Sequence, residues 1–409
     1  MAVGACAGID WAKDTHDVLV TDADGERLWR ETIAHTEAGI DRLCRTLITL
    51  RVARVAVERP DGLLIERLLD AGLTVLAIHP NMVAAARPRF RPAGGKSDQF
   101  DAFVLCELAR TDSHRFRALS PDSDQTKALK ALTRGRDVLV EQRVAMCNQL
   151  RGELERFWPG ATQIFRDLDS PISLAFLQRY PSPIDVHRLS EKRLGQFLAR
   201  HHYCGRKTPA ELLNKLHAAP AGRAGELEAD ARRGLVLALV AALKPIVEQI
   251  RLLTSEIGHA VRAHPDGHIF LSFFKSPDSV ICAATLLAEI GDDRGRYPTP
   301  EHLAADAGMS PVAVESGRKK VATFRRGCDH RLRDATCILA DATRHWHPWA
   351  QDRYATARSR GHDHPRAIRT VGRAWTRVLW RCWQDGTPYD PNRHTGLQRH
   401  LEIKIPAKG

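Results

Sequence analysis

The 409-residue sequence contains no segment typical of a membrane span or a secretion signal. No stretch reaches the roughly 18 consecutive apolar residues of a transmembrane helix, and no basic N-terminal segment precedes a long apolar one. The nine cysteines include no CxxC pair, which argues against a zinc ribbon and against a secreted disulfide framework. We therefore expect a protein of the reducing cytoplasm, without a membrane partner and long enough for more than one domain.

Acidic residues are scarce in one region of the chain. Residues 316–381 contain 16 Lys or Arg but only 5 Asp and no Glu, so most of the formal net charge of +12 is concentrated there. This density suits the neutralisation of nucleic-acid phosphates, although a solvated basic surface explains it equally well. Trp349, Trp375 and Trp383 could stack on bases, but Trp residues at helical spacing more often belong to a core.

The first hundred residues predict alternating strands and helices. We expect strands at 5–10, 15–21, 28–33, 54–58 and 73–78, and helices at 37–50, at 62–71 and from residue 96 onward. The order β-β-β-α-β-α-β-α is typical of the ribonuclease H superfamily and equally of actin-like phosphotransferases. The phosphotransferase alternative is disfavoured because the sequence has no later Asp-X-Gly turn and no Gly-rich adenosine loop.

Four carboxylates fall where a metal-dependent nuclease requires them. Asp10 ends the first predicted strand, Glu58 ends the fourth, and Asp98 and Asp101 lie on one face of a helix start. Taken singly, each is explained by solvent at a strand end or by helix N-terminal charge behind the cap Ser97. Taken as a set, they predict a site for Mg²⁺, where two ions about 4 Å apart can hold both the attacking and the leaving oxygen.

The middle of the chain predicts long helices. Residues 122–157 and 236–261 carry apolar stripes at helical spacing, and the second stripe follows a heptad pattern that contains Pro245. This proline should kink the helix or mark its start. The stripe could pack within the chain or against another protomer. Residues 170–223 predict short helices interrupted by prolines.

The C-terminal part contains an ordered series of short motifs. A helix from Ala283 ends at Gly291-Asp292, and it is followed by the stretch 303–311, by Ser316-Gly317 and by the basic stretch 324–333. This series resembles the C-terminal domain of the IS110 family of insertion-sequence transposases. Gly8-Ile9-Asp10, Val57-Glu58 and residues 96–102 resemble the N-terminal RuvC-like domain of the same family. The resemblance covers residues 5–120 and 275–350.

The resemblance implies an α/β plus all-α architecture. It implies a RuvC-like ribonuclease H-fold catalytic domain at 1–120, a helical or coiled-coil linker at 121–270, a mostly helical transposase domain at 271–390 and a tail at 391–409. It further implies a bacterial recombinase that acts on donor and target DNA as a dimer or tetramer. Members of the family are guided by a structured RNA that their own element encodes.

The resemblance also implies residue roles. Asp10, Glu58, Asp98 and Asp101 would bind the metal, and Ser316 would form a covalent phosphoserine link to a cleaved DNA strand. Basic residues near this serine would bind nucleic acid: Arg318, Lys319, Lys320, Arg325, Arg326, Arg331 and Arg333.

Three alternatives remain open at this stage. Without the resemblance, Ser316-Gly317 is more simply a turn dipeptide. A Holliday-junction endonuclease or a site-specific invertase would use the same acids with water as nucleophile. An inactive relative that only binds nucleic acid is disfavoured because the four acids and Ser316 are all present.

Overall fold

The computed structural model describes residues 4–220, 222, 224–276, 279–316 and 319–404, which form two compact units. The first unit comprises Met1–Ser123 with Asp292–Arg296, and the second comprises Asp124–Gly291 with Tyr297–Gly409. Within the described ranges, no helix combines the length and the apolar character needed to span a membrane.

The first unit is built on a mixed five-stranded sheet with the order β3-β2-β1-β4-β5. Its strands are β1 (Cys6–Trp11), β2 (Thr15–Thr21), β3 (Arg27–Ala34), β4 (Arg54–Val57) and β5 (Val75–Ala77). β2 is antiparallel to β1 and β3, whereas β4 is parallel to β1 and β5.

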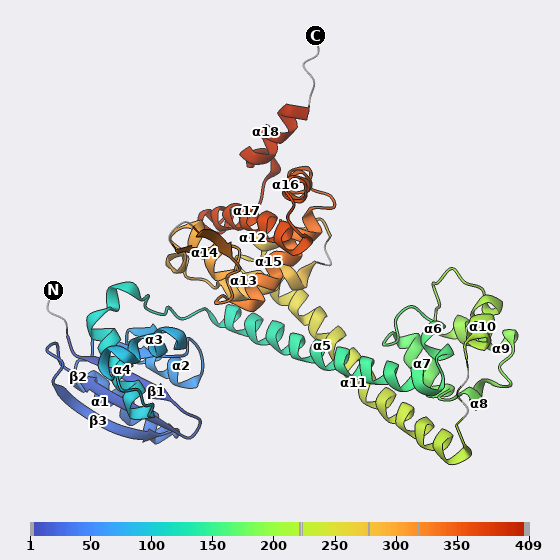
Figure 1. Ribbon diagram of the computed structural model, residues 1–409, viewed down its shortest axis with the longest axis horizontal. Helices are drawn as coiled ribbons and strands as arrows, with labels where there is room; N and C mark the ends of the chain where they lie inside the picture. The colour runs from blue at the N-terminus through green and yellow to red at the C-terminus, as the bar shows by residue number, and fades with distance from the viewer. Residues whose placement is uncertain (1–3, 221, 223, 277–278, 317–318, 405–409) are drawn as a thin grey trace, which may run out of the picture. The chain divides into compact units, whose positions relative to one another are not determined.

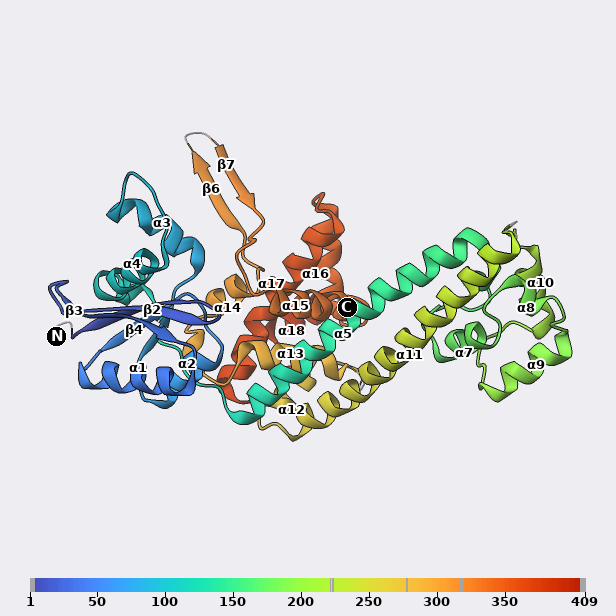
Figure 2. The ribbon, with the colours of Figure 1, turned by 90° about the horizontal axis from the view of Figure 1, so that it is seen from below.

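Helices cover both faces of this sheet (Figure 2). One face carries α1 (Glu37–Thr49) and α2 (Leu63–Asp70), and the other carries α3 (Pro80–Phe90) and α4 (Asp98–Thr111), followed by the 3₁₀ turn η1 (Ser113–Arg115). The predicted strands and helices of this unit are confirmed, with ends that differ by at most two residues.

One helix of this unit, α3, was not predicted. In the sequence, His79-Pro80 indicates only the end of a strand, but Pro80 is the first residue of α3 and His79 is its N-cap. Nδ1 of His79 accepts a hydrogen bond from the backbone N–H of Asn81 at 3.1 Å. Proline suits this first helical position because its fixed φ matches the helix and its missing N–H has no intrahelical partner there.

The second unit contains two long helices that lie side by side, α5 (Asp124–Phe157) and α11 (Glu226–Ala263) (Figure 1). Both predicted helices are confirmed, and Pro245 lies inside α11 rather than at its start. The heptad positions Val236, Val240 and Leu243 are buried against short helices of the same chain. Packing within the chain therefore accounts for this part of the stripe.

Short helices surround one end of this pair. They are α6 (Gly160–Gln163), α7 (Pro171–Arg179), α8 (Pro183–Val186), α9 (Glu191–Arg200) and α10 (Pro209–Ala218). The prolines predicted to interrupt this region open α7, α8 and α10, where the first helical position accepts proline.

The rest of the second unit is mostly helical and packs around its own core. It contains α12 (Gly267–Leu271), α13 (Val280–Ile290), α14 (Pro300–Asp306), α15 (His330–Thr343), α16 (Pro348–Ser359), α17 (His364–Asp385), η3 (Pro391–Arg393) and α18 (Thr395–Lys404). The segment Asp292–Arg296 of the first unit contains η2 (Arg294–Arg296). Trp349, Trp375 and Trp383 are all buried in this core, which excludes a base-stacking role for them in this conformation.

A two-stranded antiparallel hairpin, β6 (Val312–Ser316) and β7 (Lys319–Thr323), projects from this helical part (Figure 2). All the side chains of β6 are exposed.

Candidate active site

The backbones of β1 and α4 lie in direct contact at Gly8. A Cβ atom at this position would lie 2.1 Å from the carbonyl oxygen of Ala102 and 2.3 Å from the amide nitrogen of Cys106. The thiol of Cys106 donates a hydrogen bond to the carbonyl of Cys6 at 3.2 Å, which fixes the same contact. Only glycine fits here, and it lets α4 lie directly on the sheet.

This packing brings the predicted acids to one edge of the sheet. Ile9 pairs with Val57 in parallel register, so the next residues, Asp10 in β1 and Glu58 directly after β4, follow at neighbouring positions. Because side chains alternate along a strand, Asp10 lies on the same face of the sheet as Gly8, the face that α4 covers. α4 itself begins with Asp98.

Asp10 is close enough to the other three carboxylates for their charges to act on it. Burial raises the pKa of Asp10 to about 7, with further contributions from Asp101, Asp98 and Glu58. The ammonium of Lys96 acts in the opposite direction on this pKa.

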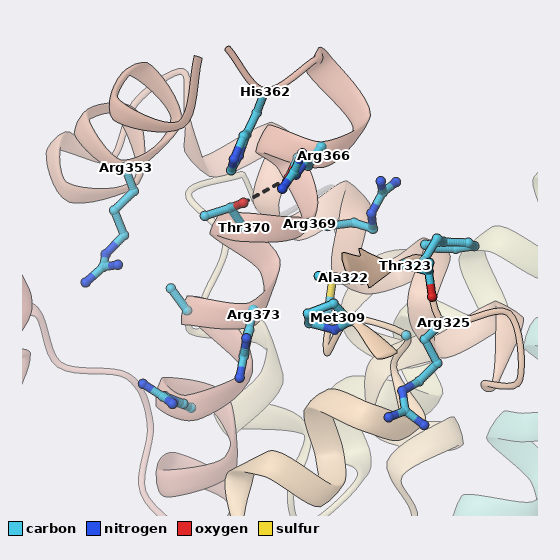
Figure 3. Close-up of a pocket in the computed structure, with 15 residues that line it drawn as sticks. Met309, Ala322, Thr323, Arg325, Arg353, His362, Arg366, Arg369, Thr370 and Arg373 are labelled. Atoms are coloured by element: carbon cyan, nitrogen blue, oxygen red, sulfur yellow. Dashed lines mark hydrogen bonds between the residues drawn. The ribbon is translucent and has the colours of Figure 1, made fainter. Parts of the chain in front are cut away.

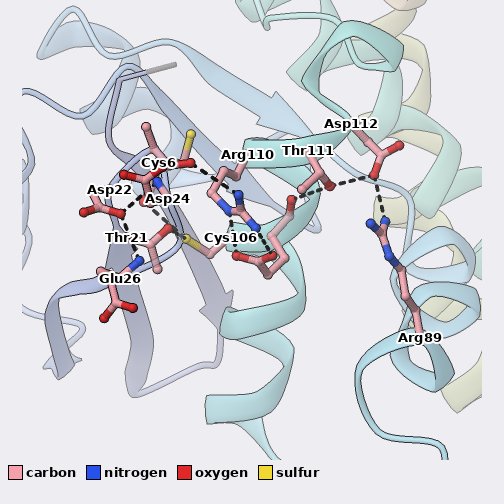
Figure 4. A network of polar contacts seen from close by, with 12 residues as sticks. Cys6, Thr21, Asp22, Asp24, Glu26, Arg89, Cys106, Arg110, Thr111 and Asp112 are labelled. Carbon is pink, nitrogen blue, oxygen red and sulfur yellow. Dashed lines mark hydrogen bonds and ion pairs between the residues drawn. The ribbon is translucent and has the colours of Figure 1, made fainter. Parts of the chain in front are cut away.

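Two cations of the first unit, Arg87 and Lys96, neutralise part of this charge, and Nζ of Lys96 lies 4.0 Å from Oδ2 of Asp101. The carboxylate of Asp101 is 2% exposed. It accepts two hydrogen bonds from Arg87, from Nε at 2.6 Å and from Nη2 at 2.9 Å. Arg87 lies on α3, and a second ion pair at 3.2 Å joins Arg89 of the same helix to Asp112 beyond the other end of α4 (Figure 4). Arg87 cannot be recognised in the sequence, because α3 is not predicted there and no separate motif marks this arginine.

The donor set suits a hard divalent cation in charge and in atom type, because carboxylate oxygens are its preferred ligands and the other three carboxylates add to the raised pKa of Asp10. Among the residues that the structure describes, however, no three His, Cys, Asp or Glu side chains are close enough together to hold an ion. Both oxygens of Asp101 accept one hydrogen bond each from Arg87, which leaves each oxygen a further lone pair that a metal could use.

Ser316 lies in the second unit, at the end of β6. The backbone register pairs Ser316 with Lys319 and Glu315 with Lys320. Arg318 lies outside the described residues. The sequence predicted a turn or a nucleophile here, and the structure has an exposed hairpin with Ser316 at its outer end.

The other predicted basic residues follow the hairpin. Arg331 forms an ion pair with Asp137 of α5 at 3.6 Å, and Arg333 forms one with Asp334 at 3.0 Å. Arg326 is exposed. The guanidinium of Arg325 is half-buried and donates a hydrogen bond to the carbonyl of Ser310 at 3.1 Å.

Comparisons with known proteins bear on both regions. A family model described as a transposase matches residues 7–159, and one described as the transposase IS116/IS110/IS902 family matches residues 279–355. The chain is 31% identical over 400 residues to the "Mini-circle putative transposase for IS117" of Streptomyces coelicolor, with 94% of this chain and 95% of that protein covered. It belongs to the IS110 family of transposases.

Two further IS110-family relatives match over nearly their full length. The 43.6 kDa protein of insertion element IS110 from Streptomyces coelicolor is 26% identical, with 97% of this chain and 98% of the relative covered. The 42 kDa protein of IS900 from Mycobacterium paratuberculosis is 27% identical, with 96% and 98% covered. As an insertion-sequence transposase the chain is a DNA-processing enzyme, and its DEDD domain suggests a divalent cation. The four acids lie in the first matched region and Ser316 in the second.

Proposed function

We propose that this IS110-family transposase cuts and rejoins DNA strands through a covalent phosphoserine at Ser316, with Mg²⁺ bound by Asp10, Glu58, Asp98 and Asp101. The observation that carries the proposal is geometric: the register of β1 and β4 puts Asp10 beside Glu58, and the close contact of Gly8 holds α4, which begins at Asp98, on the same face of the sheet. The strand order β3-β2-β1-β4-β5 supports a RuvC-like ribonuclease H fold for residues 1–120.

The acids, Arg87 and Gly8 would have different roles in this site. The four acids would hold the cation, which when bound neutralises charge on the reacting phosphate and orients its oxygens. Arg87 holds the carboxylate of Asp101 in place. Gly8 positions the start of α4 against β1, so that acids from a strand and from a helix meet at one edge.

The proposed step at Ser316 is a transesterification. The hydroxyl oxygen of Ser316 attacks a DNA phosphorus, an Oγ–P bond forms, and the P–O bond to one strand end breaks. The serine proton leaves to a base, and the departing strand oxygen takes up a proton. Attack by the hydroxyl of another strand end reverses these changes and rejoins the DNA.

We extend the proposal to domain organisation and partners. Residues 121–270 would serve as a helical linker, 271–390 as the transposase domain and 391–409 as a tail. The enzyme would act as a dimer or tetramer on donor and target DNA, guided by a structured RNA from its own element. The exposed end of β6 supports access of nucleic acid to Ser316.

Trapping of a covalent adduct tests the central claim. After denaturation, wild-type protein incubated with DNA and Mg²⁺ should remain joined to one DNA end, and Ser316→Ala should lose this adduct while it binds DNA as before. Asp10→Asn should also lose it. Cleavage by Ser316→Ala at the wild-type rate without an adduct would instead support a water-attack nuclease related to Holliday-junction endonucleases and invertases.

A mixing experiment tests how the acids and Ser316 cooperate, since they belong to different compact units. If acids from one protomer serve the serine of another, a mixture of Asp10→Asn and Ser316→Ala proteins should recover part of the activity. If one chain supplies both, the mixture should stay inactive.

A further inference from the structure

A groove lies at the base of the β6–β7 hairpin, within the second unit, with a cavity of about 550 Å³. One wall is formed by the end of β7 and the segment after it, including Thr323, Phe324 and Arg325. The other walls come from α17 and from Arg353 of α16 (Figure 3).

Arginines dominate the wall formed by α17. Arg366, Arg369, Arg373 and Arg377 follow one another at steps of three, four and four residues, which places them along one side of the helix. They extend over about 16 Å of helix axis. The opposite side of α17 is buried in the core, for example at Trp375.

The charges of this wall are largely uncompensated. Arg377 forms an ion pair with Glu301 at 3.1 Å. Within the described part of the chain, however, no carboxylate forms an ion pair with Arg366 or Arg373. Like charges four residues apart destabilise a helix, so this arrangement is unfavourable for folding alone. An extended anion bound along the arginines would offset this repulsion and make the arrangement favourable.

The shape of the groove favours a polymer over a small anion. The wall of about 16 Å is long enough to meet more than one phosphate of a nucleic-acid strand, whereas a small anion would use only part of it. A guanidinium matches two oxygens of one phosphate, and successive arginines suit successive phosphates. The guanidinium of Arg369 lies 4.7 Å from the ring centre of Phe324, a contact that orients this arginine at the hairpin base.

We propose that this arginine groove binds the phosphodiester backbone of a nucleic-acid strand without reading its bases, and holds that strand beside the hairpin that carries Ser316. The strand from Val312 to Ser316 spans about 13 Å, so the bound phosphates would lie a few nucleotides from the serine. This last point rests on the proposed role of Ser316, whereas backbone binding by the groove does not.

The test uses full-length protein in which Arg366→Gln and Arg373→Gln are combined. Its affinity is measured over a series of salt concentrations for a DNA duplex, a DNA single strand and an RNA of the same sequence. Two lost phosphate contacts should reduce the slope of log K against log salt by about 1.4 to 1.8, with a similar loss for unrelated sequences. Because neither side chain has an acidic partner among the residues that the structure describes, the unfolding temperature should stay constant or rise.

A matched control is available on the same helix. Arg381 pairs with Asp385 at 2.7 Å and does not line the groove, so Arg381→Gln should change the salt slope much less. If the slope falls for the two DNA ligands but not for RNA, the groove binds DNA. If it falls for RNA but not for DNA, the groove binds RNA. A reduced slope for all three supports a groove that accepts either.

Two results would overturn the inference. One is a double variant with an unchanged slope on all three ligands, and the other is a loss confined to a single base sequence, which would indicate base reading. Ser316→Ala in the same assay should keep the wild-type slope. If Ser316→Ala still cleaves DNA while the double arginine variant shows a reduced slope of log K against log salt, the proposed role of Ser316 is wrong. Backbone binding by the groove is then still supported.

Discussion

Asp101 in the first unit is 2% exposed and accepts two hydrogen bonds from Arg87, whereas all the side chains of β6, which carries Ser316, are exposed. The acidic edge is thus fixed by the core of its own unit. The hairpin is a two-stranded sheet without a covering layer, and such a sheet is only marginally stable in water. The acids therefore depend on internal packing, and the hairpin surface suits contact with a large partner.

We expect the largest effect on stability from Gly8→Ala, which tests whether the acidic edge depends on the packing of its own unit. The new Cβ would meet two backbone atoms of α4 at 2.1 and 2.3 Å, and backbone cannot move aside as a side chain can. We expect the first unit to lose at least about 4 kcal/mol of stability and the acidic edge to lose its order. Calorimetry with limited proteolysis should show early unfolding of the first unit and an unchanged second unit.

Gly135→Ala provides the matched control for this substitution. Gly135 lies in α5, and nothing lies within 4 Å of a Cβ added there. Alanine should stabilise this helix by about 0.5 to 1 kcal/mol. Equal effects of the two substitutions would contradict the role of Gly8.

The second unit should lose stability in mild acid through its buried histidines. Burial lowers the pKa of His347 and of His394 to about 4, from 6.5. The hydroxyl of Tyr389 lies 2.8 Å from a ring nitrogen of each. Below pH 6.5 the unfolded chain binds more protons than the folded one, so stability is lost as the pH falls from about 6.5 towards 4.

Between pH 7 and pH 5 this effect should reach about 3 kcal/mol for the two histidines together. Thermal unfolding of the second unit at a series of pH values measures it. His347→Gln should weaken the dependence of stability on pH. The control His259→Gln removes an exposed histidine that lies outside the cluster of His347, Tyr389 and His394. A pH dependence that survives His347→Gln unchanged would rule out this origin.

Asp10→Asn and Asp101→Asn separate two roles within the acidic edge. Asp10 is repelled by its neighbours, so its neutralisation should raise stability by about 1 kcal/mol. Asp101 holds Arg87, so its neutralisation should lower stability by about 2 kcal/mol. Chemical denaturation of the metal-free proteins measures both values, and changes of the same sign would contradict the assignment of Arg87 as the partner of Asp101.

The sequence predicted much of this acidic edge because its determinants are local. Strand ends, the cap Ser97 and the spacing of Asp98 and Asp101 can all be recognised in the sequence. The partner of Asp101 could not be recognised, because Arg87 meets it only through the packing of α3 on α4. Pro80, interpreted as a strand end, concealed this helix, although proline is common at a first helical position.

In the second unit the sequence indicated the excess charge but not its arrangement. The basic residues chosen near Ser316 include Arg331 and Arg333, which the fold pairs with acids. The groove depends instead on Arg366 and Arg373, whose spacing along α17 was visible in the sequence. What the sequence could not indicate is which arginines find a carboxylate in the folded chain.

We expect the smallest change in stability from a substitution at Ser316, which is exposed where Asp101 is buried. The hydroxyl of Ser316 lies on an exposed strand, so Ser316→Ala should change the free energy of unfolding by no more than about 0.5 kcal/mol. If the serine is the nucleophile, the same substitution removes all covalent adduct. Ser316 would then contribute much to activity and very little to stability, as expected for an exposed residue that acts only on a bound partner. If Ser316→Ala instead destabilises the second unit by 2 kcal/mol or more, the hydroxyl supports the hairpin, and loss of activity would no longer identify a nucleophile.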